Sequence, residues 1–207
     1  MKQSDPYLIA RVGLSLREAF PKRDTGYVVL ITSATPREGK SFVARQLTRA
    51  LAQTSEGDVA LVSPISADEV LGPIDPGSAA NGGFAGLMAN GRLSDTAFHS
   101  DGPSRVYHVP AGVTAQPDRL FHPTGVARAF LALQQRFGLC IVDGPVLAEC
   151  GAMLKHADAV VLVVDSRDTA PRTVQRELAR AGIEPGRLAG VVLNRTARGV
   201  PAWMGGD

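Results

Sequence analysis

The chain has 207 residues, of which 44% are hydrophobic and 20% charged, as is ordinary for a globular protein with one sizeable core. Its 22 basic and 20 acidic residues leave a formal net charge of +2, which is too balanced to indicate binding to nucleic acid or to an anionic membrane. The longest apolar run, Ala159–Val164, is too short to span a bilayer, and the N-terminus lacks the apolar segment of a signal peptide. We therefore expect a cytoplasmic protein without direct membrane insertion, in which Cys140 and Cys150 are reduced.

Short apolar runs alternate with segments of helical spacing along most of the chain. This alternation predicts an α/β fold, a doubly wound and mainly parallel sheet with helices on both faces, formed as a single domain over residues 1–207. Ligands of such three-layer sandwiches bind at the carboxyl ends of the strands. In chain order, we expect a strand at 27–32, a helix at 41–53, strands at 59–62 and 106–109, a helix at 124–137, strands at 139–142 and 159–164, a helix at 169–181 and a strand at 188–193.

Two segments lie outside this alternating pattern. Residues 1–24 form an N-terminal extension, in which residues 7–20 have the spacing of a helix. Residues 64–104 are rich in Gly, Pro, Ala and Ser, a composition that favours an irregular surface excursion. Within that stretch, Gly83–Met88 is a short amphipathic piece.

A phosphate-binding loop is the strongest chemical signal in the sequence. Residues 34–41 read A-T-P-R-E-G-K-S and lie between the first expected strand and the first expected helix, the context that a GxxxxGK(S/T) loop requires. Main-chain N–H groups of such a loop hold a polyphosphate, Lys40 reaches its β- and γ-phosphates, and the Ser41 hydroxyl ligates Mg²⁺. The alternative is a chance GKS in a turn before a helix. The predicted nucleotide-binding residues of this loop are Thr35, Pro36, Arg37, Glu38, Gly39, Lys40, Ser41 and Phe42.

Polar residues also follow two later strands. Asp143 comes directly after an apolar strand, which makes its carboxylate a candidate to hold Mg²⁺ through the metal's water shell, although a turn or helix cap is the alternative. Lys40 and Asp143 are therefore the candidate catalytic residues, and Ser41 and Asp143 the candidate metal ligands. Asn194 ends the last strand, where its amide offers a donor and an acceptor to a purine edge or simply forms a turn.

Five segments occur in a characteristic order: S-A-T-P-R-E-G-K-S, V-P-A-G, C-I-V-D-G-P-V, D-A-V-V-L-V-V and G-V-V-L-N-R. This order resembles the ATPase domain of the bacterial tyrosine kinases (BY-kinases) of capsule and exopolysaccharide export, within the Min/Par class of P-loop ATPases. The resemblance implies ATP or ADP with Mg²⁺ as cofactor, with Asn194 and the adjoining Arg195 at the base. It also implies a polysaccharide-export protein of the chain-length (co-polymerase) type in the inner membrane as partner, peripheral attachment through that partner, and a homo-oligomer.

The chain departs from this family at positions that carry its chemistry. Members have a second acidic motif, D-x-D, at the end of the strand after the P-loop helix, where this chain has Ser63-Pro64-Ile65. Such carboxylates orient Mg²⁺ and accept a proton from the attacking hydroxyl, and neither Ser63 nor Ile65 can do so. Asp68 and Glu69 lie a few residues further on, but nothing in the sequence directs them to the site.

Three other family features are altered. The family's loop often reads P-G-x-G-K-S, whereas Arg37 stands here in place of the glycine. The N-terminal E-x-x-R-x-x-R pattern used in ring assembly is reduced to Arg17, and the last tyrosine is Tyr107, so a C-terminal tyrosine cluster for autophosphorylation is not expected.

These observations lead to a main hypothesis with three alternatives. The main one is a BY-kinase-like protein that binds ATP or ADP with Mg²⁺, has impaired phosphotransfer and serves as a regulatory partner in exopolysaccharide export. The alternatives are an active ATPase or protein-tyrosine kinase acting on a partner in trans, a nucleotide-free pseudo-ATPase interaction module, and a partitioning ATPase of the Min/Par class. The last usually has a second lysine where this chain has Thr35.

Overall fold

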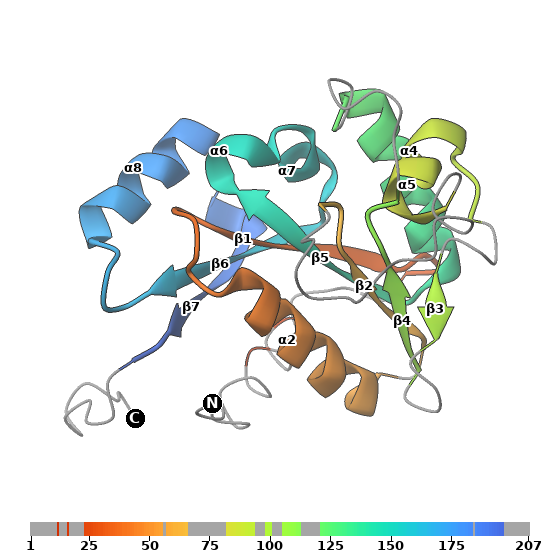
Figure 1. Cartoon of the computed structure of the whole chain (residues 1–207), viewed down its shortest axis with the longest axis horizontal. Coiled ribbons are helices and arrows are strands. Elements are labelled where there is room, and N and C mark those ends of the chain that lie inside the picture. The colour runs from red at the N-terminus through yellow and green to blue at the C-terminus, as the bar shows by residue number, and fades with distance from the viewer. Residues whose placement is uncertain are drawn as a thin grey trace.

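The computed structural model describes Val12, Leu16 and residues 23–55, 57–65, 82–93, 98–100, 105–112, 121–183 and 185–196. Within this part of the chain, seven strands form one sheet in the order β3-β4-β2-β5-β1-β6-β7 (Figure 1). Neighbouring strands are parallel, except that β3 runs antiparallel to β4. The strands are β1 (Tyr27–Ser33), β2 (Val59–Val62), β3 (His99–Ser100), β4 (Val106–Val109), β5 (Leu139–Val146), β6 (Ala159–Asp165) and β7 (Leu188–Asn194).

Helices cover both faces of this sheet, as Figure 1 shows. One face packs against α2, whose apolar side chains include Leu47 and Leu51, while α4, α5 and α7 pack on the opposite face. On that opposite face, α6 and α8 pack around Leu162 and Val164 of β6. The helices are α2 (Lys40–Thr54), α4 (Gly83–Asn90), α5 (Pro123–Arg136), α6 (Leu147–Cys150), α7 (Ala152–His156) and α8 (Pro171–Ala181), with a 3-10 turn, η4 (Pro185–Arg187).

The expected fold class is confirmed, because the central strands are buried on both faces. All seven residues of β6 are buried, and in β1 only Tyr27 is partly exposed. Such strands cannot show the alternation of a half-exposed strand, so they appear in the sequence as continuous apolar runs. A parallel arrangement follows from the helices that connect them.

Part of the expected surface excursion lies in the core. Within residues 64–104, α4 buries Phe84, Leu87 and Met88 against α5, and the main-chain N–H of Phe84 donates to the Pro110 carbonyl at 2.7 Å. The helix is short and rich in Gly and Ala, but its apolar side chains still find a partner. The apolar side of α4 therefore belongs to the packed interior, while Ala89 and Asn90 at its end are exposed.

Two other sequence expectations fall largely outside the described residues. Of the helix expected over residues 7–20, the structure describes Val12 and Leu16, both helical, and Leu16 is buried in the core on the α2 face. Asp68 and Glu69 lie outside the described residues. Among the described helices, none is both long enough and apolar enough to cross a membrane.

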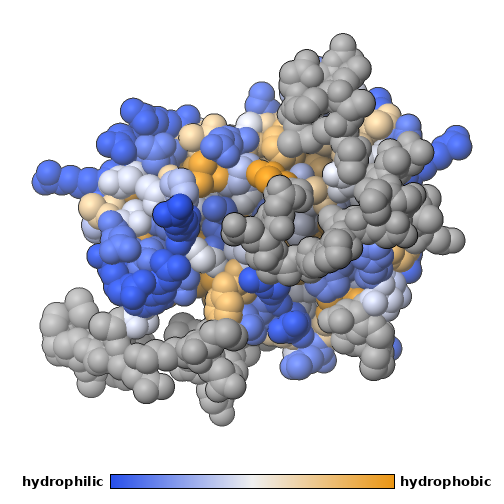
Figure 2. All heavy atoms as spheres, in the orientation of Figure 1, coloured by the Kyte–Doolittle hydropathy of each residue, from blue (hydrophilic) through white to orange (hydrophobic). Residues whose placement is uncertain are grey.

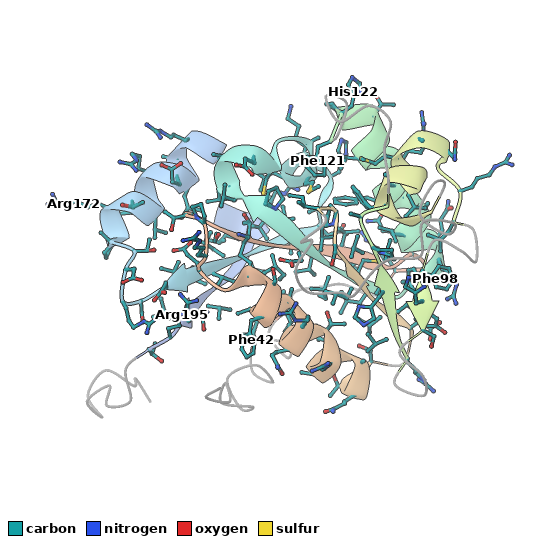
Figure 3. All side chains as sticks on the ribbon, in the orientation of Figure 1. Phe42, Phe98, Phe121, His122, Arg172 and Arg195 are labelled. Carbon is teal, nitrogen blue, oxygen red and sulfur yellow. The ribbon has the colours of Figure 1, made fainter. Side chains whose placement is uncertain are left out.

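The surface over α8 is hydrophilic in Figure 2. Its arginines at 172, 176 and 180 are exposed, and Arg172 points away from the body of the protein in Figure 3. Arg176 and Arg180 both pair with Glu177, the residue of α8 that is buried.

Candidate functional site

Four neighbouring strands, β5, β1, β6 and β7, bring polar residues to one edge of the sheet. Because these strands are parallel, their carboxyl ends lie at the same edge. Asp143 lies on β5 opposite Ile31 of β1, and Asp165 ends β6 opposite Asn194 of β7. The loop that leaves β1 lies between these groups, where the sequence predicted ligand binding.

The backbone of this loop has a specific shape. It connects Ser33 to Lys40 and holds Gly39 at φ +91° and Arg37 at φ +66°, both left-handed. A Cβ atom built on Gly39 would lie 2.2 Å from Nδ2 of Asn194, so only glycine fits there. Arg37 has an exposed side chain and accepts the left-handed conformation at a cost of about 1 kcal/mol.

The helix that follows presents an open N-terminus. Among the described residues, no side chain caps α2, and no acidic residue lies in its first turn. The first N–H groups of a helix have no partner within the helix, and together with the helix dipole they attract an anion. Lys40 and Phe42 lie in this first turn, and Figure 3 shows Phe42 at this end of α2.

Three predicted residues meet beside this helix end. Burial raises the pKa of the Asp143 carboxyl, whereas a hydrogen bond from the Ser41 hydroxyl and the charges of Lys40 and Arg45 lower it. A hydroxyl, a carboxylate and an ammonium group are therefore gathered at this end of α2. The two oxygen groups are ligands that Mg²⁺ accepts, and the ammonium group suits a phosphate. The residues present thus fit a Mg²⁺-polyphosphate.

The end of β2 differs from β5 and β6 in having no carboxylate. The residues that follow it are Ser63, Pro64 and Ile65. The Ser63 N–H donates to the Val109 carbonyl at 2.9 Å, which continues the pairing of β2 with β4. Ile65 is an exposed hydrophobic residue. These side chains can neither hold a divalent cation strongly nor accept a proton at neutral pH.

The side chain of Asn194 contacts the loop directly. Its Nδ2 donates to the main-chain carbonyl of Glu38 at 2.8 Å, and its Oδ1 accepts the N–H of Arg195 at 2.9 Å. Arg195 follows β7 (Figure 3), and its guanidinium donates to Asp165 at 2.5 Å. Asn194 and Arg195 thus lie beside the phosphate loop, and their contact with a base stays a prediction.

This fold occurs in proteins of known structure. The kinase domain of VpsO superposes with a TM-score of 0.72 at 22% identity, over 93% of this chain and 96% of that one. The kinase domain of Escherichia coli tyrosine kinase ETK gives a TM-score of 0.75 at 17% identity, over 95% and 79% of the two chains. The chain has the fold of a bacterial tyrosine-kinase domain. No protein-family model and no curated protein sequence matches it.

The BY-kinase fold is shared with ATPases of the Min/Par class. The septum site-determining protein MinD of Pyrococcus horikoshii, in its complex with Mg-ADP, superposes with a TM-score of 0.59 at 17% identity, over 86% of this chain and 75% of MinD. The resemblance inferred from the order of motifs is therefore confirmed at the level of fold.

Within this BY-kinase fold, Asp165 is a buried charged residue beside the phosphate loop that was not predicted from the sequence. Its side chain is 3% exposed and pairs with the guanidinium groups of Arg195 and Arg167. These two arginines, Arg195 first, hold its pKa at about 2, well below the usual value for an aspartate. The available signal was the same as for Asp143, a carboxylate at the end of a buried apolar strand.

The pairing of Asp165 predicts a dependence of stability on pH. A carboxyl whose pKa is lower in the folded than in the unfolded state stabilises the fold above its unfolded pKa of about 3.9, and that stabilisation is lost as the pH falls towards the folded pKa. We expect Asp165→Asn to be less stable than wild type at pH 6, and the difference to shrink between pH 4 and pH 2. Urea unfolding across this range measures it, and a difference that stays constant with pH contradicts the assignment.

Proposed function

We propose that the chain binds ADP or ATP with Mg²⁺ at the loop between β1 and α2, and that its phosphotransfer is impaired. The observation that carries this proposal is the placement of Lys40 and Ser41 at the start of α2, whose N-terminus no described side chain caps, at the same edge of the sheet as Asp143. Bound Mg-ADP in MinD, on the same fold, supports it.

Each residue has a proposed part in holding the nucleotide. Main-chain N–H groups between Thr35 and Phe42 receive the phosphates, and Lys40 donates to their outer oxygens. Ser41 ligates Mg²⁺ directly and Asp143 holds its water shell, so both suit a cation that keeps several waters. Asn194 and Arg195 lie where the base is expected.

Impaired phosphotransfer follows from the end of β2. A carboxylate that accepts the proton of the attacking hydroxyl contributes about 100- to 10,000-fold in rate. Ser63 and Ile65 occupy the corresponding positions, whereas the groups proposed to hold phosphate and metal are retained. We therefore expect the absence of these carboxylates to lower the rate of phosphotransfer more than the affinity for nucleotide.

We further propose that the chain is a cytoplasmic regulatory partner of a polysaccharide-export protein in the inner membrane. The support is the likeness to BY-kinase domains in both the order of motifs and the fold. The exposed arginines of α8 offer a face for an acidic segment of such a partner.

The rate of phosphate release from Mg-ATP tests the proposed impairment. We expect slow release by wild type and release at least about 100-fold faster by the Ser63→Asp, Ile65→Asp double variant, because the two carboxylates are restored. Adding Asp143→Ala to the double variant is the control and should abolish the gain.

Other outcomes of this assay identify the alternatives. Rapid release by wild type that Asp143→Ala abolishes indicates an active ATPase or kinase. A melting temperature that does not move with millimolar Mg-ADP or Mg-ATP indicates a nucleotide-free interaction module, because a ligand that binds the native state must stabilise it.

A further inference from the structure

The side chain of Glu38 is buried, although the two residues that precede it in the loop are exposed. Pro36 and Arg37 face solvent, whereas Glu38 is 1% exposed. Burying a carboxylate without hydrogen-bond partners costs several kcal/mol, so a buried glutamate is retained only where its oxygens are well satisfied. Its position is unusual, because a negative charge lies in the loop proposed to receive phosphates.

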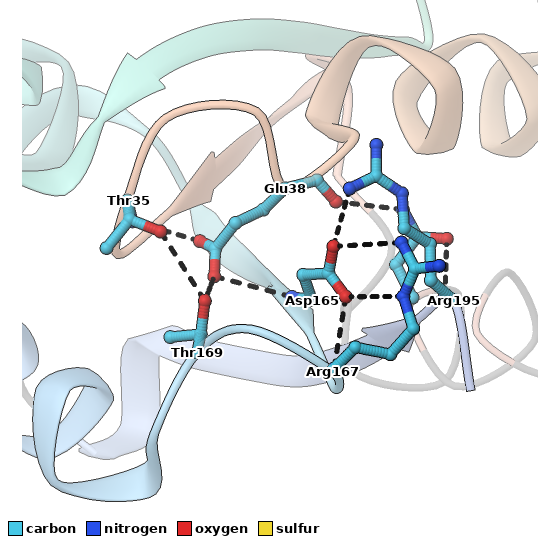
Figure 4. Close-up of polar contacts among 7 residues, drawn as sticks. Thr35, Glu38, Asp165, Arg167, Thr169 and Arg195 are labelled. Atoms are coloured by element: carbon cyan, nitrogen blue, oxygen red, sulfur yellow. Dashed lines mark hydrogen bonds and ion pairs between the residues drawn. The ribbon is translucent and has the colours of Figure 1, made fainter. Parts of the chain in front are cut away.

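Both carboxylate oxygens of Glu38 accept hydrogen bonds, as Figure 4 shows. Oε2 accepts the N–H of Thr35 at 2.9 Å. Oε1 accepts the N–H of Asp165 at 3.3 Å and the hydroxyl of Thr169 at 2.5 Å. The Thr35 and Thr169 hydroxyls also lie 3.4 Å apart. The side chain therefore joins the phosphate loop to the segment that leads from β6 into α8.

The contact within the loop has a precedent at helix ends. In a capping box, a glutamate three residues after a Ser or Thr reaches back to the N–H of that residue. Thr35 and Glu38 have this spacing and make this bond, but they close a turn in front of α2 instead of capping it. The sequence thus contains the T-x-x-E pattern of a capping box, but here the pattern stabilises the loop before α2 and not the end of the helix.

The main chain of Glu38 makes a further connection. Its carbonyl accepts the amide of Asn194 at the end of β7, so Glu38 is fixed to β6 through its side chain and to β7 through its backbone. Gly39 and Lys40 follow directly, and their N–H groups are among those proposed to receive phosphates. Because these residues are adjacent, fixing the position of Glu38 also fixes the positions of the N–H groups of Gly39 and Lys40.

We propose that Glu38 is a positioning residue, which keeps the phosphate loop in its anion-binding shape by anchoring it to Thr169 and to the main chain of Asp165. This inference rests on the proposed nucleotide binding and adds the segment after β6 to the site. The carboxylate contacts Thr35, Asp165 and Thr169, and its effect on nucleotide binding is transmitted through the main chain of the loop.

An isosteric change tests the anchor. Each carboxylate oxygen of Glu38 faces a main-chain N–H, so the amide of Glu38→Gln must place its own NH₂ against one of those donors. Calorimetric titration with Mg-ADP is expected to show a Kd at least about tenfold weaker for Glu38→Gln and for Thr169→Val. The Kd of the Glu38→Gln, Thr169→Val double variant should be about equal to that of the single variant with the lower affinity, because the two residues act as a unit.

Three matched variants separate positioning from a general loss of stability. Thr169→Ser keeps the hydroxyl and should bind Mg-ADP within about twofold of wild type. Glu177→Gln removes a buried carboxylate on α8, and Thr48→Val removes a buried hydroxyl that donates to the Ala44 carbonyl within α2. Both controls should keep the Kd of wild type.

Amide hydrogen exchange in the nucleotide-free protein provides a second readout. The N–H of Thr35 or of Asp165 should exchange at least about tenfold faster in Glu38→Gln than in wild type, and neither should change in Glu177→Gln. If wild type binds Mg-ADP and both Glu38→Gln and Thr169→Val bind it equally well, the anchor is refuted and the proposed function stands.

The outcomes remain distinguishable in two further cases. If wild type itself does not bind Mg-ADP, the proposed function is refuted, and exchange at Thr35 and Asp165 decides the anchor alone: faster exchange in Glu38→Gln supports it and unchanged exchange overturns it. If Glu38→Gln does not fold, the contrast between Thr169→Val and Thr169→Ser decides, and equal affinities of these two variants overturn the proposal.

Discussion

Replacing Lys40 with alanine is expected to weaken the binding of Mg-ADP by about 100-fold. Lys40 is the first residue of α2, and a hydrogen bond between charged groups contributes up to about 3 kcal/mol. Isothermal titration calorimetry measures the change. Lys155→Ala is the control, because Lys155 is an exposed residue of α7 and should leave the affinity unchanged.

The Lys40 variant also tests where the nucleotide binds. Equal affinities of wild type and Lys40→Ala would mean that any nucleotide bound by the chain lies elsewhere. Circular dichroism melting of the variant without nucleotide shows whether the fold is intact, and we expect a melting temperature close to that of wild type because Lys40 is partly exposed.

Replacing Phe130 with alanine is expected to lower the free energy of unfolding by about 3–5 kcal/mol. Phe130 is 1% exposed and packs against the ring of Phe84 of α4, with ring centroids 6.0 Å apart. The neighbouring residue of α5 is a matched control, since Leu131 is 54% exposed and Leu131→Ala should change stability by less than about 0.5 kcal/mol. Urea denaturation measures both, and equal effects would contradict the packing of α4 on α5.

The regular elements could be predicted because their signals are local. The first strand was expected at 27–32 and spans Tyr27–Ser33, and the helix expected at 41–53 spans Lys40–Thr54. Buried strands appear as apolar runs and surface helices as apolar residues three or four apart. Neither signal depends on what the element packs against.

The length of β5 illustrates what local signals leave out. The strand was expected at 139–142, but it continues through Gly144 and Pro145 to Val146 beside β1. A Cβ atom at Gly144 would lie 2.5 Å from Cδ1 of Leu30, so the glycine permits this close approach rather than ending the strand.

The site was predictable where chemistry follows from a motif, and not where it depends on distant partners. Lys40, Ser41 and Asp143 were predicted from the sequence, since a phosphate loop and a carboxylate after an apolar strand are recognisable there, and their roles in binding stay predictions. The buried role of the Glu38 side chain was not, because its partner Thr169 lies 131 residues away. The conformation of Arg37 was also missed, since no residue type signals a left-handed arginine.

Titration of the wild-type protein with ADP, with and without Mg²⁺, tests the central proposal most directly. We expect saturable binding of one ADP per chain, with a higher affinity when Mg²⁺ is present because Ser41 and Asp143 then hold the metal on the phosphates. Absence of saturable binding at millimolar ADP, in the presence and absence of Mg²⁺, would contradict the proposal that this loop holds a nucleotide.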